Sequence, residues 1–129
     1  MLQKRATGKY HSGGLWTNTC CGHPRNEEEI LSAAHRRLRE EMGFDCPLKE
    51  IITFTYQVNL DRGLQENEFL HVFVGTYDEI PVLNPEEADG WKWITMDELK
   101  NDIAKYPNNY TYWFKTVLEK LNDMLYMFI

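Results

Sequence analysis

The side chains best suited to chemistry lie in residues 16–24, Trp-Thr-Asn-Thr-Cys-Cys-Gly-His-Pro. Cys21 and His23 stand two positions apart, just ahead of an acidic segment. A thiolate and an imidazole at this spacing can ligate a divalent metal, or the thiol can exchange protons with a substrate. Packing is the plain alternative, because cysteine is among the residue types most often buried. The stretch therefore predicts a metal site, an acid/base thiol, or both, with packing left open.

Two further spacings bring charged groups together. Glu66 and Glu68 lie in a segment with alternating apolar residues, and alternate side chains of a strand share a face, so both carboxylates can reach one ligand. Arg37 and Glu41 are i,i+4 neighbours on a predicted helix, where a guanidinium can hold a phosphate oxygen while the carboxylate reaches a divalent ion. A solvated, salt-bridged helix face is the alternative for this second pair.

The composition narrows the class of protein and of partner. We expect 129 residues with 43% hydrophobic and 26% charged content to form one domain, 1–129, with no apolar run that could span a membrane. The start lacks an apolar signal segment and three cysteines make no disulfide framework, so a cytoplasmic location is expected. The formal charge of −6 argues against nucleic-acid binding. A basic cluster of Lys4, Arg5 and Lys9 still suits a small phosphorylated ligand.

Turn residues and apolar periodicity predict the elements that position these groups. In order they are a strand over 1–5, a loop over 6–25 with a short strand near 15–19, a helix over 27–42, a hairpin with arms near 53–58 and 66–77 around a turn at 61–63, a strand at 91–94, a short helix from 95, and a last helix from about 110. This order predicts an α+β or α/β class, with a mixed sheet and helices packed on it.

Capping residues set the expected helix ends. Asn26 is the expected N-cap of the first helix, Glu29 would complete its capping box, and Gly43 is a good stop. Thr95 begins the short helix, and Glu98 occupies its capping-box position. Both helices are therefore expected to begin with a side-chain cap.

The first helix and the loop before it carry a longer pattern. From Gly22 the chain runs five residues to Glu28, seven more to Arg36, and then Arg-Leu-Arg-Glu-Glu-Met-Gly-Phe over 37–44. This resembles the Nudix box, G-x5-E-x7-R-E-U-x-E-E-x-G-U, in which U is a bulky apolar residue. Arg37 replaces the first glutamate of R-E-U, and the other fixed positions match. The spacing match favours a functional helix over a merely solvated one.

Arg37, taken with residues 16–24, narrows the resemblance to the type 1 isopentenyl-diphosphate isomerases. The similarity runs from Arg5 almost to the C-terminus and includes Glu-Asn-Glu at 66–68 and Trp-Phe at 113–114. It implies an α+β, Nudix-like α/β/α fold with a mixed sheet flanked by helices. It also implies an enzyme of isoprenoid biosynthesis that interconverts isopentenyl and dimethylallyl diphosphate. Such an enzyme adds a proton on one face of a double bond and removes another from the opposite face.

The resemblance also assigns roles to single residues, and its implied partner is a small homoallylic or allylic diphosphate. The catalytic groups would be Cys21, Glu68, Tyr56 and Trp113. The phosphate-binding cations would be Arg5, Lys9 and Arg37. Glu41 matches a residue that helps hold Mg²⁺ on the diphosphate. The ligands of a second divalent metal, Mn²⁺, Mg²⁺ or Zn²⁺, would be His23, Glu66 and Glu68.

Elementary chemistry agrees with these roles. Isomerising an unactivated alkene needs an acid and a base on opposite sides of a carbocation-like centre, which a thiol and a carboxylate supply. An indole face such as that of Trp113 stabilises the positive charge without capturing it as water would. On periodicity alone Tyr56 and Trp113 would be core aromatics. Cys20 and the histidines at 11, 35 and 71 are expected to be structural.

Family members are expected to have several dozen residues before the position of Met1, including a diphosphate-binding lysine and two metal-binding histidines. The sheet is thus expected to lack a strand segment, and three remaining metal ligands would bind weakly and support little activity. A Nudix diphosphate hydrolase is one alternative, disfavoured because Arg37 removes a box carboxylate. A non-catalytic diphosphate-binding remnant is the other. A monomer or weak dimer is expected.

Overall fold

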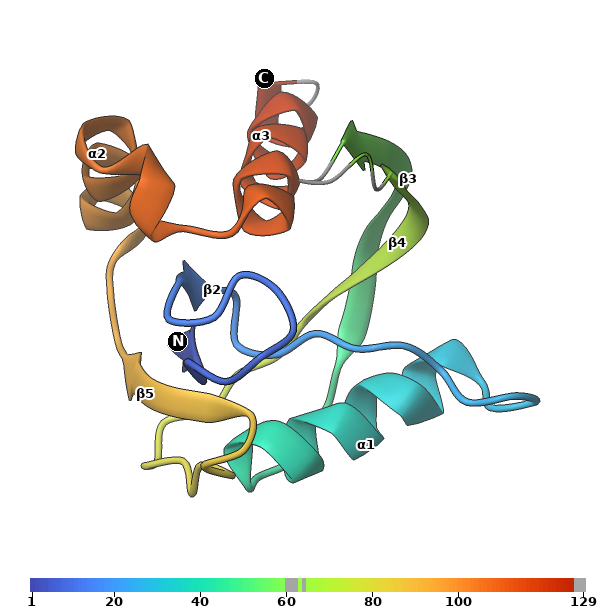
Figure 1. Ribbon diagram of the computed structural model, residues 1–129. Coiled ribbons are helices and arrows are strands. Elements are labelled where there is room, and N and C mark those ends of the chain that lie inside the picture. The colour runs from blue at the N-terminus through green and yellow to red at the C-terminus, as the bar shows by residue number, and fades with distance from the viewer. Residues whose placement is uncertain (60–62, 64, 127–129) are drawn as a thin grey trace. The chain divides into compact units, whose positions relative to one another are not determined.

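The structure, a computed structural model, describes residues 1–59, 63 and 65–126 (Figure 1). The chain divides into two compact units, Met1–Asp45 with Glu79–Ile129 and Cys46–Asp78, and each is described by itself. The single domain expected over 1–129 stays a prediction. The elements in order are β1 (Leu2–Arg5), β2 (Trp16–Thr17), α1 (Ile30–Met42), β3 (Lys49–Asn59), β4 (Gln65–Val74), β5 (Ala88–Lys92), α2 (Met96–Lys105), the 3₁₀ turn η2 (Pro107–Asn109) and α3 (Tyr112–Tyr126). The predicted α+β class is confirmed.

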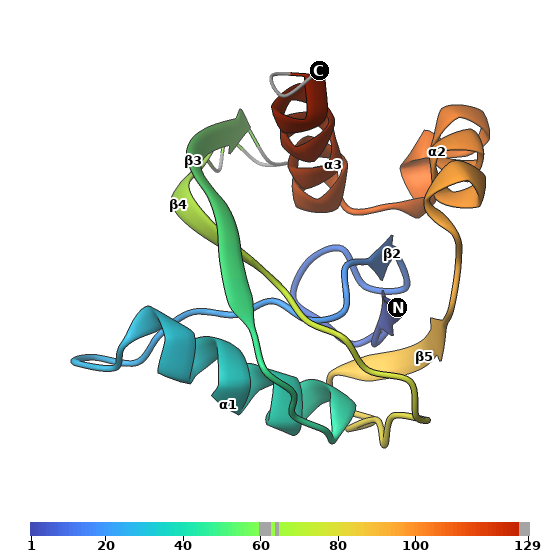
Figure 2. The same cartoon turned by 180° about the vertical axis from the view of Figure 1, so that it is seen from behind.

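The first unit is built on a three-stranded antiparallel sheet in the order β2-β1-β5. Gln3, on the central strand, lies opposite Thr17 of β2 and Trp91 of β5. A parallel bridge joins Trp16 to Tyr110, just before α3. In both views α1 lies on one side of this sheet, and α2 and α3 lie on the other (Figures 1 and 2). The sheet therefore holds the loop of residues 16–24 between two helical layers.

The core of the first unit draws apolar side chains from every layer. Its buried members are Leu2, Ala6, Ala33, Leu38, Met42, Ala88, Leu99, Tyr110, Trp113 and Phe114. Three of them lie on α1 at positions that follow the helical period, which is why that helix packs on the sheet. Among the described residues, no helix is long and apolar enough to cross a bilayer.

The start of α1 corrects a prediction. The helix begins at Ile30, not at 27, and its N-cap is Glu29, which makes no side-chain cap bond. Asn26 is therefore not the cap, and the capping box does not form. The Glu28 carboxylate instead accepts hydrogen bonds from the Arg25 amide and the Arg36 guanidinium, and Glu27 has a left-handed φ of 64°. A backbone in that conformation cannot continue a helix backwards.

Other predicted ends are confirmed or shifted. Gly43 ends α1 with a φ of 70° and an amide bonded to the Arg39 carbonyl, as glycine at this position predicts. Thr95 caps α2 and accepts from the Glu98 amide at 3.2 Å, as expected. The strand predicted at 91–94 is instead Ala88–Lys92, because its pairing with β1 runs from Lys92 back to Ala88.

The second unit is the antiparallel hairpin of β3 and β4. β3 extends beyond the arm predicted at 53–58, and β4 ends at Val74, before the end predicted at 77. Tyr56 lies directly opposite Glu68 in the register. Of the turn predicted at 61–63, residues 61 and 62 lie outside the described residues, and Gly63 has the positive φ of 74° that a turn glycine adopts. The alternation of half-buried and exposed residues over 52–57 confirms the predicted strand period.

Candidate active site

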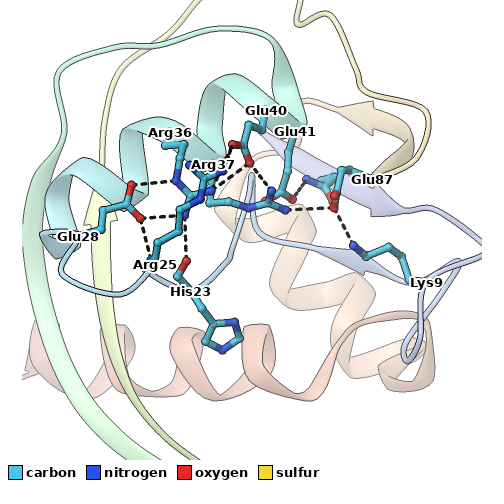
Figure 3. A network of polar contacts seen from close by, with 10 residues as sticks. Lys9, His23, Arg25, Glu28, Arg36, Arg37, Glu40, Glu41 and Glu87 are labelled. Atoms are coloured by element: carbon cyan, nitrogen blue, oxygen red, sulfur yellow. Dashed lines mark hydrogen bonds and ion pairs between the residues drawn. The ribbon is translucent and has the colours of Figure 1, made fainter.

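The loop after β2 carries Cys21 and His23 and is held by side chains at several points. Cys21 is half-buried and His23 is exposed. The Asn18 amide donates to the Cys20 carbonyl at 2.6 Å. The Arg36 guanidinium donates to the His23 carbonyl at 3.1 Å, and the His23 ring points away from the charged residues around it (Figure 3). The backbone on both sides of Cys21 is therefore fixed by polar side chains, as a positioned thiol requires.

Arg36 of α1 forms hydrogen bonds with the loop that precedes this helix. Its guanidinium bonds both oxygens of Glu28 at 2.9 Å and the Glu40 carboxylate at 3.1 and 3.2 Å (Figure 3). The hydrogen bond from Arg36, reinforced by the Arg25 backbone amide, lowers the pKa of Glu28 to about 2. Glu28 and Arg36, two fixed positions of the Nudix pattern, thus hold the loop against the helix.

This pairing predicts an acid-sensitive contribution to stability. Because the pKa of Glu28 in the folded state lies near 2 and its ordinary value is 4.5, the contribution is present above pH 4.5 and is lost as pH falls from 4.5 toward 2. Glu28→Gln should therefore unfold at a lower temperature than wild type at pH 6, and the two melting temperatures should converge as pH falls through that window. Glu29→Gln removes a neighbouring exposed carboxylate and serves as the control. A difference that does not change with pH contradicts the prediction.

Arg37 lies at the centre of a second charge cluster (Figure 3). Its Nη1 lies 2.5 Å from Glu40, and its Nη2 lies 3.1 Å from Glu41 and 3.1 Å from Glu87. The same Oε2 of Glu87 is 2.7 Å from Lys9 Nζ. Burial works against ionisation of Glu87, but the Lys9 hydrogen bond and the Arg37 charge lower its pKa. Two predicted phosphate-binding cations therefore meet on one carboxylate, as they would on a phosphate oxygen.

Glu41 is the most deeply buried carboxylate of this cluster, with 2% of its surface exposed. Burial raises its pKa, and the Gln3 hydrogen bond and the Arg37 charge oppose that rise. Gln3 donates to Oε1 at 3.1 Å, whereas Oε2 accepts no hydrogen bond although Arg37 Nη2 lies close by. A buried carboxylate oxygen without a hydrogen bond is suited to a hard divalent cation. The donor chemistry at Glu41 thus fits the metal that the sequence predicts there.

Gly22 allows Arg37 to approach the loop. A Cβ placed on Gly22 would lie 2.7 Å from both Cγ and Nε of Arg37. These distances are shorter than a carbon contact tolerates, so a side chain at Gly22 would force the guanidinium stem to move. The absence of a Cβ at Gly22 therefore leaves room for the stem of the arginine that departs from the Nudix pattern.

Arg5 and Trp113 form the second group of predicted residues that the structure brings together. The Arg5 guanidinium carbon lies 5.0 Å from the indole centroid, and Arg5 Nη2 donates to the His11 carbonyl at 3.2 Å. Arg5 is 8% exposed, and its Nε–H is buried without a hydrogen bond. The Trp113 N–H donates to Asn18 at 3.2 Å. A buried cation with an unused donor beside an aromatic face suits an anionic ligand with an apolar part.

Tyr56 and Glu68 belong to the hairpin unit, where their side chains share a face and line a shallow hollow with Thr55, Gln57, Asn67 and Phe69. The side chain of Glu66 lies outside the described residues. In the part of the chain that the structure describes, no group of three or more His, Cys, Asp and Glu side chains could hold a metal ion. The ligand set His23, Glu66 and Glu68 therefore stays a prediction.

Sequence reasoning missed Glu87, Gln3 and Asn18. Glu87 lies in the loop before β5, where the sequence Asn-Pro-Glu-Glu shows only turn residues and no period. Gln3 was part of a predicted strand, and one polar residue in a strand is usually solvated. It is buried because its side chain contacts Glu41 and Met42 of α1, which packs on the sheet.

Comparison with known proteins shows which family the chain belongs to. A NUDIX domain is matched over residues 1–114. The chain is 56% identical over 121 residues to "Isopentenyl-diphosphate Delta-isomerase 2" of Aromatoleum aromaticum, covering 94% of this chain and 64% of the relative. It is 51% identical over 122 residues to the protein of the same name from Photorhabdus laumondii, covering 95% and 69%. The chain thus spans roughly two thirds of the length of these curated relatives.

A solved structure shares the fold at lower identity. A protein from Deinococcus radiodurans, whose crystal structure is known, superposes with a TM-score of 0.67 at 21% identity, covering 81% of this chain and 63% of that one. This likeness supports the fold alone. The identity to the two longer relatives, together with the NUDIX match, settles the family: the chain belongs to the isopentenyl-diphosphate Delta-isomerases within the NUDIX domain family.

Proposed function

We propose that this chain acts in the interconversion of isopentenyl and dimethylallyl diphosphate. Family membership supports the proposal, and one structural observation carries it: the Arg5 guanidinium lies 5.0 Å from the Trp113 ring centroid. A cation that binds the diphosphate and an indole that stabilises a carbocation are the two things that this substrate class needs close together. A hydrolase that cleaves a phosphoanhydride forms no carbocation and so has no need of the indole.

The reaction moves one proton in and one proton out. A proton is added to the terminal methylene carbon of isopentenyl diphosphate, a tertiary cation forms at C3, and a proton leaves C2, so the charges balance. We assign these transfers to Cys21 and Glu68, with Tyr56 beside Glu68 in the hairpin register. The indole of Trp113, fixed by its hydrogen bond to Asn18, would face the cation. Water must be excluded, because it would capture that cation.

The diphosphate is assigned to Arg5, Lys9 and Arg37. Lys9 and Arg37 already share one oxygen of Glu87, so an incoming phosphate oxygen would meet two cations held at the right spacing. The NUDIX isomerase family suggests use of a divalent metal. When bound, a Mg²⁺ ion at Glu41 would neutralise diphosphate charge, and the buried Oε2 of Glu41 is the group that fits it. A second divalent metal at His23, Glu66 and Glu68, and a cytoplasmic location, remain parts of the proposal.

Proton exchange tests the proposed reaction. Prolonged incubation with isopentenyl diphosphate in deuterated water should place deuterium in the C5 product, detected by mass spectrometry, even at the low turnover expected from three metal ligands. Release of inorganic phosphate or pyrophosphate without labelled isomer would instead support a NUDIX hydrolase. Binding of the diphosphate with neither label nor release would support a non-catalytic diphosphate-binding protein. Either result contradicts the isomerase assignment.

A further inference from the structure

Gln3 carries an amide side chain at the centre of the first unit's sheet. It lies on the middle strand β1 and is 1% exposed. Burying an amide is unfavourable unless its N–H groups and oxygen find partners. An apolar residue would fill the same space at lower cost, so the partners of Gln3 indicate what the amide does there.

The two oxygen acceptors of its N–H₂ group belong to the candidate active site, and the Met42 sulfur of α1 is a third partner at 3.5 Å. Nε2 donates to Oε1 of Glu41 at 3.1 Å and to the carbonyl of Thr19 at 2.9 Å. Thr19 lies two residues before Cys21. Each of the two hydrogens of the amide thus has an oxygen acceptor, one on α1 and one on the thiol loop. One side chain of the sheet therefore connects the Glu41 carboxylate to the loop.

The two carboxylate oxygens of Glu41 have different surroundings. Oε1 is held by Gln3, whereas Oε2 is buried, accepts no hydrogen bond and lies 3.1 Å from the Arg37 guanidinium that is assigned to the diphosphate. A carboxylate fixed at one oxygen loses rotational freedom about its terminal bond, so its other oxygen has a defined direction. Because β1 is paired on both sides, the strand that carries the donor is held in place.

We propose that Gln3 is a positioning residue that holds Oε1 of Glu41 so that Oε2 is presented to a divalent cation arriving with the diphosphate. Through the Thr19 carbonyl the same amide sets the distance between that cation and the loop that carries Cys21. The inference rests on the proposed function for its diphosphate ligand, and it concerns a residue that does not itself touch metal or substrate.

The test uses the whole chain, with Mn²⁺ as the metal and inorganic pyrophosphate as the ligand. Gln3→Met keeps the length of the side chain and removes both donors. Electron paramagnetic resonance of unbound Mn²⁺, with pyrophosphate saturating, should show about tenfold weaker Mn²⁺ binding in the variant, the usual effect of losing a group that orients a metal ligand. Pyrophosphate affinity without metal should stay within about threefold, because Lys9 and Arg37 are untouched.

Tyr110→Phe is the matched control. It also removes a hydrogen-bonding group from a residue that is 2% exposed, the hydroxyl that donates to Asp102, at a place outside the site. Its Mn²⁺ affinity should remain within about twofold of wild type. If Gln3→Met and Tyr110→Phe bind Mn²⁺ alike, or if wild type binds no Mn²⁺ with pyrophosphate, the inference is overturned.

A second measurement avoids the variant should it fail to fold. In ¹⁵N-labelled wild type, the side-chain amide signal of Gln3 should shift when Mg²⁺ is added to the pyrophosphate-bound protein, and an unchanged signal contradicts the inference. Failure of the isomerase proposal is read separately, from the absence of deuterium in the product. The proposal that Gln3 positions a metal ligand is therefore tested independently of turnover.

Discussion

Cys21→Ala and Glu68→Gln are each expected to abolish isomerisation while leaving diphosphate affinity within about tenfold, roughly 1.4 kcal/mol. Each variant removes one of the two groups assigned to proton transfer and leaves Arg5, Lys9 and Arg37 in place. An alkene proton transfer without its acid or its base loses the lowered barrier and keeps the binding energy. Deuterium incorporation at saturating substrate measures the first quantity, and calorimetry with the diphosphate measures the second.

Cys20→Ala is the control for the thiol. Cys20 is the adjacent cysteine of the same loop, half-buried like Cys21, and its carbonyl accepts from Asn18 whatever its side chain is. The alanine variant should therefore turn over nearly as fast as wild type. If it proved as damaging as Cys21→Ala, the thiol assignment would be wrong. Loss of diphosphate binding in Glu68→Gln would likewise move that residue from proton transfer to ligand binding.

Arg37→Met should weaken pyrophosphate binding by at least about 30-fold, roughly 2 kcal/mol, because it removes a guanidinium from a partly desolvated phosphate site. It should also lower the free energy of unfolding by about 1–3 kcal/mol, since Glu41 and Glu87 lose a common countercharge. Titration calorimetry gives the binding constant, and urea unfolding gives the stability.

Two companion variants separate these effects. Arg39→Met removes an arginine of the same helix that is 55% exposed and pairs with Asp45, so it should change neither quantity appreciably. Arg37→Met combined with Glu87→Gln should recover part of the lost stability, because the uncompensated carboxylate is gone, without recovering binding. Equal binding by Arg37→Met and Arg39→Met would exclude Arg37 from the phosphate site.

Local sequence rules predicted the parts of the fold that depend on neighbouring residues. The Gly43 stop and the Thr95 cap are decided by one residue each and by the backbone beside it, and both are confirmed. Asn26 satisfied the same capping rule and failed, because Glu28 is bound to Arg36 from the next turns of α1 and the backbone turns sharply at Glu27. The hydrogen bond between Glu28 and Arg36, eight positions apart, replaced the expected cap between Asn26 and Glu29, three positions apart.

In the candidate site, too, local contacts were predictable from the sequence and contacts between distant segments were not. The i,i+4 spacing of Arg37 and Glu41 is a property of any helix, and the structure places the two groups 3.1 Å apart as expected. The pairing of Glu87 with Lys9 joins two loops through the β1–β5 ladder, and no periodicity in the sequence reports such a contact. Gln3 was missed for the same reason. Contacts between elements far apart in the sequence, here Gln3 with Glu41 and Met42 of α1, determine which polar residues become buried.

The contact between Gly22 and Arg37 bears on how this sequence can change over generations. The side chain at position 37 occupies the volume that any residue other than glycine would need at position 22. The two positions are therefore not independent: a larger residue at 22 needs either a shift of the Arg37 stem or a shorter side chain at 37, and the shorter side chain removes a proposed phosphate-binding cation. The constraint runs in one direction, because glycine at 22 leaves position 37 open to other residues, whereas arginine at 37 disfavours a side chain at 22.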